Sequence, residues 1–292
     1  MFNLIMTTRQ VESKETIRFL ESLKNQPKSV KENVTLIAVV QQKEELPVDL
    51  DLYKVKVIHV EPCSLSKARN IGIDAIEDQS GIVAFPDDDC WYNDKVLPKA
   101  QEILDEGIYD FVSLGIYDPI KNLEFGRNRT LNEICEIDQQ NVLVKPISVS
   151  IFYKFNKKEE IPRFDELFGV GTPWGSGEET DFLLNLMYAG KKGLINTTVT
   201  VYHECAREKD FDAKVTYKYS VGFAAMMIKS KLLRGQTLAF KMYKKLKLRA
   251  RIAILYFFFN GKKRRNYIAR VKGFNRGEKE GKAFYKNKVK NG

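Results

Sequence analysis

The sequence of 292 residues lacks the patterns of a disulfide-linked or membrane-spanning protein. Its four cysteines lie far apart without a Cys-x-x-Cys pair, which predicts reduced thiols in a cytosol. The longest apolar run near the carboxyl end, 252–259, is eight residues long, whereas a bilayer-spanning helix needs about 20. Because no basic stretch followed by an apolar one opens the chain, we expect no signal peptide. The sequence therefore predicts a cytoplasmic protein.

Acidic residues are almost absent from the last third of the chain. Residues 213–292 hold 23 lysines and arginines against two acids, whereas residues 1–212 carry more acids than bases. Between Leu238 and Phe257 apolar side chains fall on one helical face, with basic residues around them. Such a segment predicts peripheral binding to an anionic membrane surface through residues 213–277, at the inner face of the cell membrane. The alternative is a packed helical extension whose basic face is only solvated.

Apolar runs alternate with helical patterns along the first 212 residues. Strands are predicted at 3–8, 34–40, 55–60, 82–85, 109–117, 142–155 and 199–203, and helices at 12–24, 64–77, 95–106 and 181–189. Strands that are apolar throughout, with helices between them, are typical of an α/β fold whose mostly parallel sheet is covered on both faces. We expect one domain over 1–212 and a basic helical extension over 213–292, with glycines separating its helices.

Three adjacent aspartates, Asp87, Asp88 and Asp89, follow the predicted strand at 82–85. In open α/β sheets, ligands bind at the carboxyl ends of the strands. Adjacent carboxylates repel one another unless a cation or hydrogen-bond donors hold them. Mg²⁺ and Mn²⁺ bind such oxygen ligands together with phosphate oxygens. The aspartates therefore predict a site for a divalent ion and a nucleotide; the alternative is an acidic turn that starts the next helix.

Three further motifs accompany the aspartates: Ser66–Gly72 (SKARNIG), Trp174–Phe182 (WGSGEETDF) and Val201–Glu204 (VYHE). In this order the four motifs resemble the family 2 glycosyltransferases of the GT-A fold, especially bacterial enzymes of capsule and exopolysaccharide biosynthesis. The resemblance covers residues 1–205. It implies inversion at the anomeric carbon, a nucleoside-diphosphate sugar donor (a UDP-sugar is expected), Mn²⁺ or Mg²⁺, and a glycan or lipid-linked acceptor.

The resemblance also implies roles for single residues. Asp87 matches an aspartate near the ribose and the metal, Asp89 matches the metal ligand, and Glu179 falls at the position of the catalytic base. Further matches are Thr7, Arg69 and Asp88 at the nucleotide, Trp174 and Glu178 near the acceptor, and His203 at the metal or the diphosphate.

Two positions depart from the family pattern. Thr7-Thr8-Arg9 replaces a proline and an asparagine, and Gln41-Gln42 replaces an acidic pair that contacts the nucleobase, so the base is not predicted. Two motifs also have structural explanations. Ser176 and Glu179 fit a helix capping box, and His203 with Cys205 could bind zinc, although no second pair of ligands has suitable spacing.

Three other functional classes share some of these features. A nucleic-acid-binding protein is suggested by the basic segment, but no binding motif is present and residues 1–212 are acidic, so no nucleic acid is expected. A sugar-nucleotide pyrophosphorylase should carry a glycine-rich basic loop after its first strand, which this chain lacks. A pseudoenzyme that only binds a sugar nucleotide is disfavoured because Asp87, Asp89 and Glu179 are all present.

Overall fold

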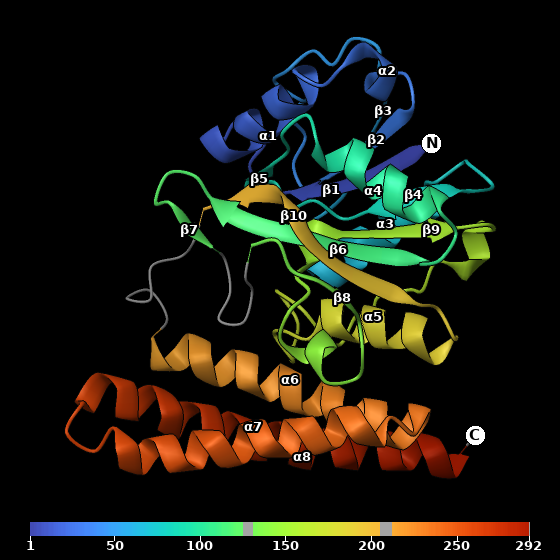
Figure 1. The fold of residues 1–292 in the computed structure, drawn as a ribbon. Helices are drawn as coiled ribbons and strands as arrows, with labels where there is room; N and C mark the ends of the chain where they lie inside the picture. The colour runs from blue at the N-terminus through green and yellow to red at the C-terminus, as the bar shows by residue number, and fades with distance from the viewer. Residues whose placement is uncertain (125–130, 205–211, 292) are drawn as a thin grey trace. The chain divides into compact units, whose positions relative to one another are not determined.

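The computed structural model describes residues 1–124, 131–204 and 212–291. The chain forms two compact units (Figure 1). The first comprises Met1–Arg163 and Ala189–Cys205, and the second Phe164–Tyr188 and Ala206–Gly292. The boundaries differ from the division at 212, because the segment that carries Trp174 and Glu179 belongs to the unit of the carboxyl-terminal helices. Cys90 and Cys135 are free thiols.

A ten-stranded sheet forms the centre of the first unit, with the order β3-β2-β1-β4-β9-β6-β10-β5; β7 pairs with β6 and β8 with β10. The strands are β1 (Phe2–Thr8), β2 (Val34–Val40), β3 (Lys54–His59), β4 (Gly81–Ala84), β5 (Cys90–Trp91), β6 (Phe111–Asp118), β7 (Leu123–Glu124), β8 (Ile134–Glu136), β9 (Ile151–Phe155) and β10 (Gly193–His203). The first four strands are parallel, and β9 is antiparallel to its neighbours β4 and β6. The α/β fold predicted from the sequence is confirmed, but the sheet is mixed: four of its strand pairs are parallel and five are antiparallel.

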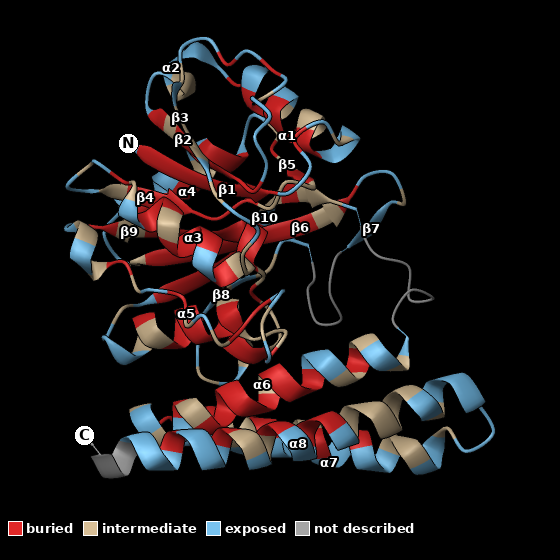
Figure 2. Ribbon diagram, turned by 180° about the vertical axis from the view of Figure 1, so that it is seen from behind, coloured by how far each residue is buried: buried red, intermediate tan, exposed pale blue. Residues whose placement is uncertain are grey.

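Four α-helices accompany this sheet: α1 (Lys14–Lys24), α2 (Lys28–Lys31), α3 (Leu65–Asp74) and α4 (Val96–Asp105). Three single 3₁₀ turns lie at Asn141–Leu143, Ser148–Ser150 and Lys158–Glu160. Ser64 caps α3 by accepting a hydrogen bond from the Lys67 backbone N–H. Gly72 lets α3 approach β1, since a Cβ there would lie 2.3 Å from Ile5 Cγ2. Figure 2 shows β1 and β6 as buried strands, and the core lies against them.

Two strand predictions differ from the structure. The strand expected at 142–155 begins only at Ile151, because Pro146 has no backbone N–H for a sheet and the residues before β9 form 3₁₀ turns. β10 begins at Gly193, six residues before the predicted start. Its register shifts between Asn196 and Thr200, and the polar residues at this irregularity conceal the strand in the sequence.

The second unit is helical: α5 (Glu178–Tyr188), α6 (Ala213–Arg234), α7 (Thr237–Tyr256) and α8 (Gly261–Asn291). Gly235, with φ of 65°, ends α6, and Gly261, one of the glycines predicted to separate helices, begins α8. Gly273, Gly277 and Gly281 do not separate helices but lie inside α8, so that part of the prediction is wrong. Their spacing of four residues places them on one face of α8, where a Cβ at Gly277 would lie 2.1 Å from the Val221 carbonyl oxygen. They allow α8 to pack closely on α6.

No helix among the described residues is long and apolar enough to cross a membrane.

Candidate functional site

The carboxyl edge of the parallel strands brings together several residues singled out from the sequence. Thr7, near the end of β1, forms an isolated bridge with Asp87 beyond β4. The short strand β5 pairs antiparallel with β10, and Cys90 lies opposite His203. Because Asp89 immediately precedes Cys90, this pairing places Asp89 beside His203, although 114 positions separate them in the chain. The sheet therefore unites two of the predicted motifs.

Asp89 and His203 form an ion pair, with 3.2 Å between Asp89 Oδ1 and His203 Nε2. The other ring nitrogen, Nδ1, lies 2.8 Å from the backbone oxygen of Glu204, to which it can donate. Burial would lower the pKa of His203, but Asp89 outweighs it and raises the pKa above 6.5. Burial would raise the pKa of Asp89, but His203 lowers it below 3.8. The contact thus favours the charged form of each group.

Asp87 is held by Arg69, whose side chain is 1% exposed on α3. Arg69 Nη2 donates to Asp87 Oδ1 over 2.7 Å and to Ser148 Oγ over 3.2 Å. Burial raises the pKa of Asp87, although Arg69 opposes the shift. A buried guanidinium fixed between two acceptors keeps one carboxylate oxygen in place at the edge of the sheet.

Asp88 has a different environment. Burial raises its pKa to about 6, and a hydrogen bond with the Thr8 side chain opposes this shift. The three adjacent carboxylates thus have three separate partners, Arg69, Thr8 and His203. This distribution explains how their mutual repulsion is tolerated. The aspartates do not start a helix, because β5 follows them and α4 begins only at Val96.

The two departures from the family pattern are in contact with each other. Arg9 Nε donates to Gln41 Oε1 over 3.2 Å, and the Cys63 backbone N–H donates to the same oxygen over 2.8 Å. Arg9 Nη2 also donates to the Cys63 carbonyl oxygen over 2.6 Å. Gln42 Oε1 accepts from the Val11 backbone N–H. The arginine after β1 and the glutamine after β2 are therefore one coupled feature of this edge.

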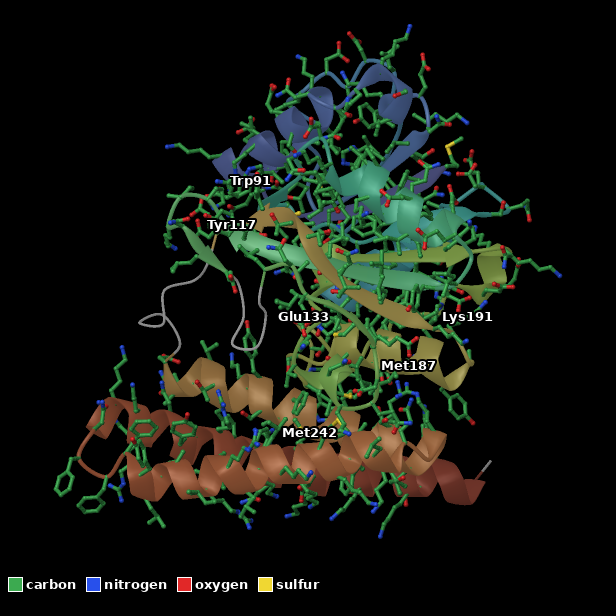
Figure 3. The ribbon with its side chains drawn as sticks, viewed as in Figure 1. Trp91, Tyr117, Glu133, Met187, Lys191 and Met242 are labelled. Atoms are coloured by element: carbon green, nitrogen blue, oxygen red, sulfur yellow. The ribbon has the colours of Figure 1, made fainter. Side chains whose placement is uncertain are left out.

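Arg18 of α1 is a site residue that the sequence did not reveal. Its guanidinium donates to Glu204 Oε1 over 2.7 Å and to the Asp89 backbone oxygen over 3.3 Å. It also lies 3.7 Å from the centre of the Trp91 ring, a cation–π contact. Trp91 and Tyr117, labelled in Figure 3, lie toward the same end of the sheet and both contact the Tyr202 ring. Arg18 is 71 positions from Asp89, so no local pattern connects them.

Among the described residues, no group of three or more histidine, cysteine, aspartate and glutamate side chains is arranged to hold a metal ion alone. Cys205, the possible zinc partner of His203, lies outside the described residues.

In the second unit, Glu178 and Glu179 form the start of α5. Glu178 is 9% exposed, whereas Glu179 is partly exposed. Tyr219 of α6 is near both carboxylates, and burial together with these two charges raises its pKa. The Gly177 carbonyl oxygen accepts the first hydrogen bond of α5, from Asp181 N–H, so Gly177 occupies the N-cap position. Ser176 instead donates its hydroxyl to the Tyr219 carbonyl oxygen, so the predicted capping box is not the role of this serine.

A buried ionic network holds α5 in the second unit. The Asp181 side chain is 1% exposed and accepts from Lys229 Nζ over 2.7 Å and from Arg234 Nη2 over 2.8 Å. Lys229 also donates to Asp165, which accepts from the Tyr285 hydroxyl of α8 as well. Because every charge in this group has a partner, α5 and its leading glutamates are fixed to α6 and α8.

Trp174 lies in the core of the second unit and is only 7% exposed. Its Nε1 donates to Glu280 Oε2 of α8 over 3.1 Å, and its ring packs against Phe168, Phe284 and Tyr285. Most of the indole is therefore covered by other residues of the same unit. Its expected contact with an acceptor stays a prediction.

An α/β sheet with an aspartate cluster at the carboxyl edge of its parallel strands is typical of the GT-A glycosyltransferase fold, which the comparisons support. The sequence model described as glycosyl transferase family 2 matches residues 4–164. The chain belongs to this family. A comparison with curated protein sequences gives no match.

Solved structures with the same fold include S. aureus TarS, with a TM-score of 0.57 and 17% identity; the match covers 89% of this chain and 44% of that one. TarS 1–349 in complex with UDP-GlcNAc gives 0.55 and 14% identity, over 96% of this chain and 90% of that one. The same fragment in complex with UDP gives 0.53 and 16%, over 98% and 91%. This chain thus spans less than half of the longer TarS chain, and the likeness is one of fold.

Proposed function

We propose that the protein is an inverting glycosyltransferase that moves a sugar from a UDP-sugar to a hydroxyl group of a glycan acceptor. The observation that carries this proposal is the cluster of Asp87, Asp89 and His203 at the carboxyl edge of the sheet. Family membership supports glycosyl transfer. The UDP-GlcNAc and UDP complexes of TarS, a protein of the same fold, support uracil as the base of the donor.

The residues of this cluster suit Mn²⁺ or Mg²⁺. Asp87 and Asp89 offer carboxylate oxygens, and the Nδ1 hydrogen bond of His203 orients its Nε2, the usual arrangement of a metal-binding histidine. Such ions often take one or two protein ligands and complete their shell with substrate phosphate and water. The bound ion would neutralise charge on the departing diphosphate. Thr7, Arg69 and Asp88 surround the same edge and would contact the nucleotide.

We assign the general base to Glu179. Inversion requires a carboxylate that takes the proton of the attacking acceptor hydroxyl while the nucleoside diphosphate leaves from the opposite face. Glu179 is the more accessible of the two glutamates, and the Asp181 network fixes the helix on which it lies. Glu178 and Trp174 are the proposed acceptor contacts.

The acceptor is proposed to be lipid-linked, in the biosynthesis of a surface polysaccharide, with the enzyme peripheral at the inner face of the cell membrane. The charge of the second unit supports this location. Both acids of 213–292 are paired inside the unit: Glu278 with Lys244 and Lys247, and Glu280 with Arg276. The net charge of this segment is strongly positive and suits an anionic bilayer.

A thermal-shift screen of nucleoside diphosphates, each with and without Mn²⁺, tests the donor site. We expect UDP to raise the melting temperature more than nucleoside diphosphates with other bases do, and chiefly when Mn²⁺ is present. Release of UDP from UDP-sugars in the presence of glycan acceptors then tests transfer. A stabilising effect of UDP without any turnover would leave a sugar-nucleotide-binding pseudoenzyme.

A further inference from the structure

Large apolar side chains are exposed where α7 meets α8. Leu255 and Tyr256 at the end of α7 are 75% and 80% exposed, and Phe258 and Phe259 in the following turn are 58% and 98% exposed. Elsewhere in the helical bundle of α6, α7 and α8, Tyr243 and Phe274 are buried, at 0% and 5%, and the exposed aromatic residues Tyr219 and Phe284 reach only 45% and 40%. Figure 1 shows α7 and α8 running side by side up to this connection, which we term the hairpin tip (residues 255–260).

The hairpin tip is an ordered turn, not a loose loop. The Phe258 N–H donates to the Leu255 carbonyl, and the Asn260 N–H donates to the Phe257 carbonyl. Asn260 then caps α8, because its Oδ1 accepts from the Lys263 N–H. The Phe257 ring stacks on Tyr267 of α8 at 5.5 Å with an interplanar angle of 5°. Phe257 therefore closes the hairpin, and Phe258 and Phe259 are left on its outside.

Four cations follow the hairpin tip: Lys262, Lys263, Arg264 and Arg265, in the first turn of α8. Positive charge at a helix N-terminus opposes the helix dipole, so these residues do not serve helix stability. No acid lies between Asp212 and Glu278 to balance them. Arg264 lies 5.0 Å from the Phe258 ring, so charge and apolar surface occupy one small region.

The hydrophobic face predicted for α7 is not free along its whole length. Ala239, Tyr243 and Ala250 of this helix are buried in the bundle, and Lys247 is bound to Glu278. The large apolar residues exposed on this helix are Leu238, Leu248, Ile252, Leu255 and Tyr256, and four of these five lie in its carboxyl-terminal half. A helix lying flat in the interface would need an apolar face along its length.

We infer that the hairpin tip inserts into anionic bilayers end-first. Phe258 and Phe259 lead into the headgroup–acyl boundary, Leu255 and Tyr256 follow, and Lys262–Arg265 bind lipid phosphates. This inference rests on the membrane-bound part of the proposed function and is independent of the sugar transferred. Aromatic rings beside lysine and arginine are the composition of interfacial anchors, and four cations add attraction to an anionic leaflet.

The first test measures binding of the full-length protein to vesicles of phosphatidylglycerol and phosphatidylethanolamine. We expect Phe258→Ser with Phe259→Ser to lower the partition constant about tenfold or more at about 0.5 M NaCl, where surface attraction is screened. Leu233→Ser with Leu238→Ser, two exposed leucines near the opposite end of α7, is the matched control and should bind like the wild type. Equal loss in both double variants would overturn the inference.

The second test measures depth. Phe259→Trp, Ile252→Trp and Leu238→Trp each add one tryptophan to Trp91 and Trp174, whose signal the wild type provides as a blank. Quenching by brominated lipids should fall in the order 259, 252, 238. Equal quenching at the three positions would show a flat helix and contradict end-first insertion.

Two further outcomes also contradict the inference: loss of self-association in the serine variant without loss of vesicle binding, and tighter binding to single-stranded RNA than to these vesicles. UDP release with a soluble glycan acceptor, measured on the same variants, should be unchanged. If the wild type inserts but releases no UDP, the proposed transferase function fails and the insertion stands.

Discussion

The two compact units use buried ion pairs for opposite purposes. In the first unit, Asp87, Asp89 and their cationic partners end at the carboxyl edge of a sheet, where a ligand can compete for them. In the second unit, Asp181 and Glu278 are enclosed by lysines and an arginine that join helices to one another. Ion pairs at the edge of a sheet are candidates for a binding site, whereas ion pairs between packed helices stabilise the fold.

Glu179→Gln is expected to have the largest effect on the reaction. It should lower kcat by roughly 10²-fold or more, because an amide cannot take the acceptor proton, while UDP binding stays unchanged. Steady-state kinetics with calorimetry of UDP binding measures both. Glu178→Gln, the less exposed neighbour, is the control and should retain most of the turnover. If the two variants lose activity equally, the assignment of the base to Glu179 is wrong.

Asp89→Asn tests whether Asp89 in the first unit binds a metal ion. We expect Mn²⁺-dependent affinity for UDP to fall about 10- to 100-fold, since Asp89 would be a ligand and also orients His203. Calorimetry with and without Mn²⁺ measures this change. Asp94→Asn, an exposed aspartate a few residues along, should bind UDP normally. Undiminished binding by Asp89→Asn would mean that its pair with His203 is structural.

Gly277→Ala tests the architecture of the second unit. A Cβ at this position meets backbone atoms of α6, so we expect a loss of up to about 3 kcal/mol in the free energy of unfolding. Gly261→Ala, where a Cβ meets nothing within 4 Å, is the control and should unfold like the wild type. Thermal unfolding followed by circular dichroism measures both variants. Equal stability of the two would show that α8 does not need its glycines.

The smallest expected effect is on the stability of the second unit at acidic pH. Burial would raise the pKa of Glu278, but hydrogen bonds from Lys247, Tyr243 and Lys244 lower it to about 2, from 4.5. Its contribution to stability is therefore complete above pH 4.5 and is lost as the pH falls toward 2. Glu278→Gln should remove this part of the acid sensitivity, roughly 1 kcal/mol, because solvent reaches one of its partners, Lys244. Helix content measured from pH 6 to pH 2 checks it, with the exposed Glu12→Gln as control. An unchanged acid transition would contradict the role of this carboxylate.

The sequence predicted the first unit better than the second. The strands β1, β2 and β4 are continuous apolar runs, so their bounds were nearly right, and the aspartates after β4 marked the edge that carries the site. Arg18 and Ser148 were missed, because each reaches the site only through tertiary pairing of distant segments. Such contacts have no local periodicity.

In the second unit, local patterns were misleading. Gly273 and Gly277 lie within a helix, where glycine is intrinsically unfavourable, and only the nearby backbone of α6 explains them. Trp174 also packs against Glu280 and Tyr285, which lie more than 100 positions away in the chain. The core of the second unit depends on which helices pack together, and the sequence alone does not show this.

The path of the chain through its two units restricts how such proteins can be recombined. Phe164–Tyr188 belongs with the carboxyl-terminal helices, while the chain between Ala189 and Cys205 returns to the sheet as β10. A chimera in which only the part after residue 205 is exchanged would therefore pack α5 against helices from another protein. Asp181 would then lose its native partner Arg234. A chimera that keeps these contacts must exchange residues 164–188 and 206–292 together, with breakpoints near 163, 188 and 205. We expect the helical part of this lineage to be inherited with its α5 segment, as one block interrupted by a strand.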